Sequence, residues 1–114
     1  MDSEKKGLKI YVAGPYTASH PRDIQKNVDT AIDVGIELVK KGHYPYIPHL
    51  THYIDIRPHC ELDWKDYMRL DNKWLEACDA LFYISPSRGA DIELEAAKRR
   101  GLKIYTSLED VPDV

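Results

Sequence analysis

The chain alternates between short apolar runs and longer stretches in which apolar residues recur every three or four positions. The short runs end at glycine, proline or serine and predict buried β-strands, whereas the longer stretches predict amphipathic helices. The expected strands are residues 8–13, 44–47, 79–84 and 102–106. The expected helices are residues 23–41, a helix that starts near 61–63 and runs to Ala77, a helix that follows Gly89 and closes at 98–101, and one turn within 107–114.

Strands that alternate with helices predict a parallel sheet with right-handed crossovers, in a small doubly wound α/β fold. We expect a single domain over residues 1–114, with four to five strands and helices on both faces of the sheet. The proline in 44–47 predicts an edge strand, and 48–60 has no clean period, so we expect a long loop that can include a helical turn. In the strand order 2-1-3-4 the topology reverses between the first and third strands, where such sheets bind ligands.

Two carboxylates stand where the helical pattern expects apolar residues. Asp71 lies within the stripe formed by Trp64, Met68, Leu75 and Cys78, and Glu93 lies on the inward stripe of the following helix. A buried carboxylate needs a partner or a shifted pKa, so both residues are candidates for catalysis. The pattern is equally compatible with a half-exposed Asp71 and with a Glu93 that favours the helix dipole.

Other segments give weaker indications of a binding or catalytic site. Residues 85–89 (Ser-Pro-Ser-Arg-Gly) precede a helix and could hold an anion, or Ser87 could simply cap that helix. The loop with His49, His52, His59 and Cys60 has loose zinc-ligand spacing, although such loops are more often polar or base-contacting. Neither a Walker loop nor a serine-nucleophile elbow is present in the sequence. The aromatic residues Trp64, Tyr67 and Trp74 are expected to pack the helix or to stack on a base.

Composition narrows the class of protein. The 114 residues are 43% hydrophobic and carry a formal net charge of −3, with a pI near 5.9. An acidic balance argues against binding to a nucleic-acid backbone, and no apolar run is long enough to span a bilayer. The charged N-terminus and the two cysteines, Cys60 and Cys78, predict a cytoplasmic protein without a disulfide framework.

Two acids held in different environments are what glycosidic cleavage requires. A buried, apolar-flanked Asp71 would have a raised pKa and suit the acid. A Glu93 held ionised near a helix N-terminus would suit the nucleophile.

Three segments together resemble the nucleoside 2-deoxyribosyltransferase superfamily, over about residues 8–106. They are Ile-Tyr-Val-Ala-Gly-Pro at 10–15, Asp71-x-x-Trp74-Leu75-x-x-x-Asp79, and Ser87-x-Gly89-x-x-x-Glu93-Leu94-x-x-Ala97. By spacing, the sequence looks closest to the 2′-deoxynucleoside 5′-monophosphate N-glycosidases or to an uncharacterised branch near them. The resemblance implies a flavodoxin-like (Rossmann-like) sheet, an N-ribosyl bond as substrate, no cofactor or metal, and a homodimer or higher homo-oligomer.

Carried over by position, the resemblance implies that Glu93 forms a covalent sugar ester, that Asp71 assists departure of the base, and that Tyr11 orients Glu93. Pro15, Tyr16 and Thr17 fill the loop in which the monophosphate-hydrolysing branch has an arginine, so Arg22 or Arg88 would have to replace it. The implied substrate-binding residues are Gly14, Tyr16, Arg22, His49, Ser87, Arg88 and Gly89.

The sequence therefore predicts an enzyme that cleaves the N-glycosidic bond of a (deoxy)nucleoside 5′-monophosphate. Two alternatives stay open: a nucleoside deoxyribosyltransferase that exchanges bases, and a nucleotide-binding or sensor domain without turnover. The base, the sugar, and the choice between hydrolysis and transfer are not specified by the spacing.

Overall fold

A computed structural model describes residues 6–114 and contains a four-stranded parallel sheet in the order β2-β1-β3-β4. The strands are β1 (Lys9–Ala13), β2 (Tyr44–Tyr46), β3 (Ala80–Tyr83) and β4 (Lys103–Tyr105). The doubly wound α/β fold and the strand order are those predicted, and β2 with its proline is an edge strand. The topology therefore reverses between β1 and β3, where a ligand crevice is expected.

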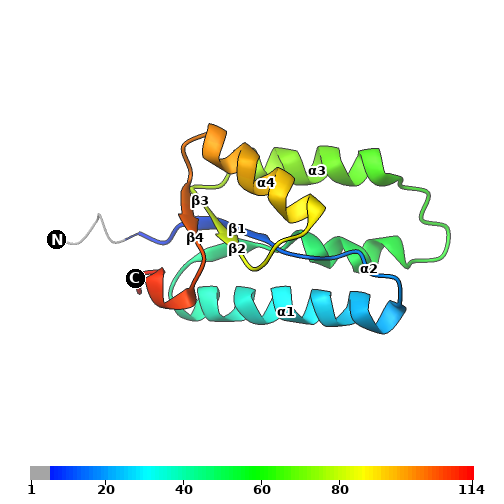
Figure 1. Ribbon diagram of the computed structural model, residues 1–114, viewed down its shortest axis with the longest axis horizontal. Coiled ribbons are helices and arrows are strands. Elements are labelled where there is room, and N and C mark those ends of the chain that lie inside the picture. Colours follow the sequence, from blue (N-terminus) through cyan, green and yellow to red (C-terminus); the bar gives the residue numbers. More distant parts are fainter. Residues whose placement is uncertain (1–5) are drawn as a thin grey trace.

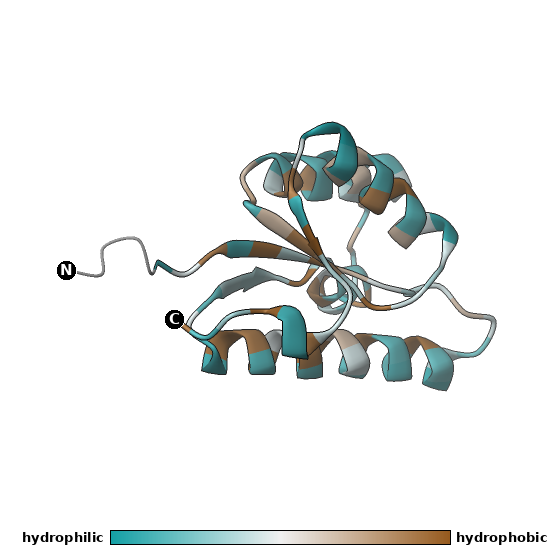
Figure 2. Cartoon of the chain, turned by 60° about the vertical axis from the view of Figure 1, so that its left-hand side comes forward, coloured by the Kyte–Doolittle hydropathy of each residue, from teal (hydrophilic) through white to brown (hydrophobic). Residues whose placement is uncertain are grey.

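Helices cover both faces of the sheet (Figure 1). α1 (Pro21–Lys40) lies on one face, and α3 (Trp64–Glu76) and α4 (Arg88–Arg99) lie on the other. Successive side chains of β1 point to opposite faces of the sheet, so the hydrophobic core consists of two clusters, one on each face. Ile10 and Val12 pack in the cluster on the α1 side, whereas Tyr11 and Ala13 pack with residues of α3 and α4. Figure 2 shows hydrophobic residues in the strands of the sheet, and hydrophobic residues that recur at intervals along the helices on either side of it. Tyr11 thus faces the helix that carries Glu93.

Helix boundaries follow local capping chemistry. α1 begins at Pro21, two residues earlier than predicted, because the His20 side chain accepts from the Arg22 N–H and proline occupies the first turn. α3 begins at Trp64, where Asp63 and Asp66 form a reciprocal capping box. Ser87 caps α4 by accepting from the Ala90 N–H at 3.1 Å, which confirms the capping interpretation of that serine.

The segment 48–60 is more regular than a loop. It contains a 3-10 turn, η1 (Pro48–Thr51), and a one-turn helix, α2 (His52–Asp55). The predicted inward stripe of the next helix needs one correction, because the Trp64 side chain is 69% exposed. The first turns of α3 extend past the ends of the strands (Figure 1), and Trp64 is the first residue of this helix.

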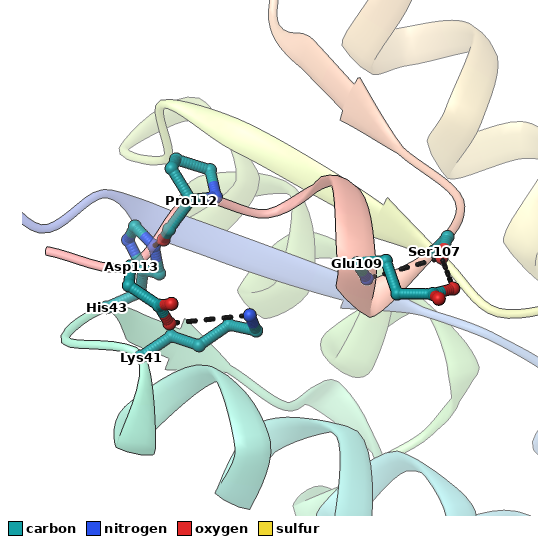
Figure 3. Close-up of polar contacts among 6 residues, drawn as sticks. All are labelled: Lys41, His43, Ser107, Glu109, Pro112 and Asp113. Atoms are coloured by element: carbon teal, nitrogen blue, oxygen red, sulfur yellow. Dashed lines mark hydrogen bonds and ion pairs between the residues drawn. The ribbon is translucent and has the colours of Figure 1, made fainter.

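The C-terminal segment returns to the α1–β2 turn, with a 3-10 turn, η2 (Leu108–Asp110), on the way. His43 is buried and binds at both ring nitrogens: Nδ1 accepts from the Leu8 N–H at 3.0 Å, and Nε2 donates to the Pro112 carbonyl at 2.6 Å. Lys41 pairs with Asp113 at 3.4 Å (Figure 3), and Val111 is buried in the core on the α1 side. These contacts fix the ends of β1 and β2 opposite the crevice.

Candidate active site

A cavity of about 210 Å³ opens at the carboxyl ends of β1, β2 and β3, at the point where the topology reverses. Loops after β1 and β2, the first half of α3 and the first two turns of α4 supply its walls. The lining residues are Gly14, Tyr16, Thr17, Pro48, His49, Thr51, Asp55, Trp64, Tyr67, Met68, Asp71, Gly89, Ala90 and Glu93. The two carboxylates singled out by their sequence positions, Asp71 and Glu93, therefore face one cavity.

Glu93 is held by the sheet. It is on the second turn of α4, and its carboxylate accepts a hydrogen bond from the Tyr11 hydroxyl on β1. Burial raises the pKa of Glu93 to about 7; the hydrogen bond from Tyr11 opposes this rise, and the charge of Asp71 adds to it. Burial also raises the pKa of Tyr11, with Glu93 and Asp71 adding to the effect. Tyr11 is therefore a proton-bearing donor to Glu93 at neutral pH.

Asp71 is held by the edge strand. The Tyr46 hydroxyl on β2 donates to Asp71 Oδ1 at 3.0 Å. Burial raises the pKa of Asp71 to about 6, and the hydrogen bond from Tyr46 opposes the rise. Burial and the nearby Asp71 carboxylate in turn raise the pKa of Tyr46. The two carboxylates thus titrate close to neutrality, which is where acid–base chemistry is most effective.

The environments of the two acids differ from the prediction in one respect. A helix N-terminus was expected to hold Glu93 ionised, with Asp71 as the group of raised pKa. Glu93 is the sixth residue of α4, beyond the first turn in which the dipole acts, and burial raises its pKa as it raises that of Asp71. Protons on the pair are therefore shared between two nearly matched groups.

His49 contributes a fixed, neutral ring to the wall. It is 4% exposed, and its Nε2 lies 3.1 Å from the carbonyl oxygens of both Gly14 and Pro15. Burial lowers the pKa of His49, so the ring is neutral with its proton on Nε2. Nδ1 is consequently an acceptor, and within residues 6–114 it has no hydrogen-bond partner. Nδ1 has almost no accessible surface, so it is enclosed by the protein and does not face the open part of the cavity.

The outer wall of the cavity contains several polar side chains that contact one another. Tyr67 on α3 donates to Asp55 Oδ1 at 2.9 Å and lies 3.4 Å from Cys60 Sγ. Tyr16 contacts His52 Nδ1 at 2.9 Å through its hydroxyl. Asp55, Tyr16 and Tyr67 all line the cavity, so α2 contributes a third carboxylate to it.

Of the ten residues predicted for the site, six line the cavity and Tyr11 reaches it through Glu93. Arg22 and Arg88 are exposed, and neither they nor the capping Ser87 belongs to the lining, so their part in binding stays a prediction. The sequence reasoning missed Tyr46 and Asp55. The six predicted residues that line the cavity are Gly14, Tyr16, His49, Asp71, Gly89 and Glu93.

The aromatic residues of α3 divide between the two expected roles. Trp74 stacks on Tyr46 with ring centroids 5.5 Å apart, so it packs, while Trp64 and Tyr67 line the cavity where a base could stack. Within residues 6–114, no group of three or more His, Cys, Asp or Glu side chains is gathered as a metal site. Among the helices of the same residues, none is long and apolar enough to cross a membrane.

The fold and the cavity place the chain among parallel α/β proteins with a crevice at the topological switch. Residues 8–107 match the family described as a domain of unknown function, DUF7768, and the chain belongs to that family. A search of curated proteins gives no match.

Among solved structures the chain is similar to a 2-deoxyribosyltransferase from the psychrotolerant bacterium Bacillus psychrosaccharolyticus. The TM-score is 0.62 at 17% identity, over 84% of this chain and 69% of that one. At this identity the likeness supports the shared fold.

Proposed function

We propose that this protein cleaves or exchanges the N-glycosidic bond of a nucleoside, with Glu93 as nucleophile and Asp71 as acid. The observation that carries the proposal is the placement of two largely buried carboxylates, each with a raised pKa and each held by a tyrosine hydroxyl, in one cavity. The fold shared with a 2-deoxyribosyltransferase supports the same reaction class. Ser87 has no comparable support as a nucleophile, since its hydroxyl caps α4.

The reaction needs one bond made and one broken at the anomeric carbon. The ionised Glu93 carboxylate attacks that carbon, and the bond to the base nitrogen breaks with its electron pair remaining on the base. Protonated Asp71 gives its proton to the departing base, which leaves neutral. Attack by water, or by a second base, on the sugar ester then releases Glu93 and decides between hydrolysis and transfer.

Tyr11 acts on the nucleophile. Its hydroxyl donates to Glu93 and so favours the ionised carboxylate that attacks. The same hydrogen bond fixes one oxygen of Glu93 and leaves the other to approach the sugar.

The charges around the cavity favour an uncharged nucleoside over a 5′-monophosphate. Asp55, Asp71 and Glu93 line it, and within the described part of the chain no lysine or arginine does. A phosphate dianion would be repelled by carboxylates at short range in a partly desolvated site. The monophosphate remains the alternative, with Arg88 and the start of α4 as the groups that would have to receive it.

The test is release of free base, followed by chromatography, from a panel of ribo- and deoxyribonucleosides and their 5′-monophosphates. Wild type and Glu93→Gln are compared, each with and without a second free base. Release by wild type alone supports the glycosidase, and exchange without net release supports the transferase. Tight binding of a panel member without turnover would overturn the catalytic proposal in favour of a sensor. Size-exclusion chromatography of the same samples tests the predicted homo-oligomer.

A further inference from the structure

Asp71 and Glu93 each receive a hydrogen bond from a tyrosine, and these two tyrosines are paired across the sheet. Tyr11 on β1 and Tyr46 on β2 are register partners in the parallel ladder. Register partners on adjacent strands point to the same face of a sheet, and the two rings lie 5.5 Å apart, centroid to centroid. The ladder therefore sets the spacing of the two donors and, through them, of the two carboxylates.

The ring of Tyr46 is fixed from two sides. On one side it contacts Tyr11, and on the other it is stacked on Trp74 with centroids 5.5 Å apart and an interplanar angle of 16°. Trp74 follows Asp71 by three residues on α3, so both side chains lie on adjacent turns of one helix. The phenol is thus held between β1 and the helix that carries the residue to which it donates.

We propose that Tyr46 is the positioning residue for Asp71, fixing Oδ1 so that Oδ2 carries the proton toward the departing base. This inference rests on the proposed N-glycosidic cleavage and assigns a role to a residue that lies behind the cavity lining. A phenol hydroxyl donates one hydrogen bond, so Oδ1 is occupied as an acceptor and the carboxyl proton is placed on the other oxygen. Tyr46 itself exchanges no proton with the substrate.

Tyr46 also affects how Asp71 titrates. The hydrogen bond opposes the effect of burial and keeps the pKa of Asp71 at about 6. Without it, the neutral acid would persist to higher pH but with a carboxyl free to rotate. Loss of the hydroxyl should therefore reduce proton transfer and at the same time shift the pH dependence, a combination that a packing defect does not produce.

The experiment compares wild type with Tyr46→Phe, which keeps both ring contacts and removes only the hydroxyl. Two substrates are used: a preferred nucleoside, whose base needs a proton to leave, and a pyridinium N-riboside, whose cationic base leaves without one. We expect kcat for the nucleoside to fall about tenfold, the magnitude of one lost hydrogen bond to a carboxyl group. The pH optimum should rise by a few tenths of a unit, while kcat for the pyridinium riboside should change less than twofold.

Tyr44→Phe is the matched control, because Tyr44 is on the same strand, is 66% exposed and does not line the cavity. Equal losses on both substrates with an unchanged pH optimum would mean that Tyr46 only packs, and would overturn the inference while leaving the proposed reaction intact. Undiminished kcat on the nucleoside would overturn it as well. Failure of wild type to release base from either substrate would instead overturn the proposed function, and the role of Tyr46 with it.

Discussion

Glu93 and Asp71 face one cavity from two different helices, and burial raises the pKa of both carboxyl groups. Burial raises the pKa of Glu93 to about 7 and that of Asp71 to about 6. The reactive form, with Glu93 ionised and Asp71 protonated, is one of the two forms in which the pair holds a single proton. The two forms carry the same charge, so pH alone does not interconvert them.

This relationship predicts a bell-shaped dependence of kcat/KM on pH, with a maximum between about 6 and about 7. The rate falls at lower pH because Glu93 is protonated, and at higher pH because Asp71 has lost its proton. For a pyridinium N-riboside, which needs no acid, the falling limb should disappear. Initial rates over pH 5–9 check both shapes, and a nucleoside profile that rises steadily to pH 9 would contradict the role of Asp71.

Tyr11→Phe should move that maximum upward. The hydrogen bond from Tyr11 opposes the raised pKa of Glu93, so its loss makes Glu93 harder to ionise. We expect kcat/KM near neutral pH to fall by about tenfold to a hundredfold, the range for a hydrogen bond to a charged group. Tyr83→Phe is the control, since Tyr83 makes a similar bond, 2.6 Å long, to Asp91 of the same helix but outside the cavity. A similar loss in both variants would assign the effect to packing of α4.

Glu93→Gln should stabilise the fold above neutral pH while abolishing turnover. The folded-state pKa of Glu93, about 7, exceeds its unfolded value of 4.5. The neutral form therefore stabilises the fold fully below about pH 4.5, and this contribution is lost as the pH rises through about 7. Glutamine does not ionise, so at pH 8 the free energy of unfolding should increase by about 1–3 kcal/mol.

Urea unfolding at pH 4.5 and pH 8 checks this prediction. The gain should be present at pH 8 and nearly absent at pH 4.5. Glu95→Gln is the control on the same helix, where an exposed pair with Lys98 at 3.6 Å contributes little. Equal effects of Glu93→Gln at both pH values would mean that ionisation of Glu93 is not what destabilises the site.

The two acids could be found from the sequence because a carboxylate in an apolar stripe stands out against helical periodicity. Tyr46 could not, since a tyrosine in a short strand is ordinary, and its bond to Asp71 depends on the register between β1 and β2. Asp55 was hidden in a segment without periodicity, where only the fold of η1 and α2 turns it toward the cavity. Trp64 was placed inside by its spacing, although the sheet ends before the helix does.

Asp55→Asn should make the cavity more tolerant of a phosphate. Removing one of three lining carboxylates reduces repulsion of a 5′-monophosphate, while an uncharged nucleoside is less affected. We expect the ratio of kcat/KM for monophosphate over nucleoside to rise about two- to tenfold at low salt, and less at high salt because exposed charges are screened. Asp33→Asn on the exposed side of α1 is the control. A ratio that is unchanged at low salt would contradict the electrostatic argument for a nucleoside substrate.

Two glycines with positive φ allow the contribution of the C-terminal segment to be measured. Gly42 has φ +96° and Gly101 has φ +74°, so alanine is strained at both. At Gly42 an added Cβ would also lie 2.6 Å from Val114 Cγ2 and 2.8 Å from its carbonyl oxygen, whereas at Gly101 it would meet open space.

Gly42→Ala should therefore lower the free energy of unfolding by about 1–3 kcal/mol more than Gly101→Ala, because the clash must displace the segment held by His43 and Lys41. Thermal and urea unfolding of both variants give the difference directly. Since the segment lies opposite the cavity, base release at a temperature well below unfolding should be the same in both. A loss of activity confined to Gly42→Ala would show instead that the C-terminal segment and the crevice are coupled through β1 and β2.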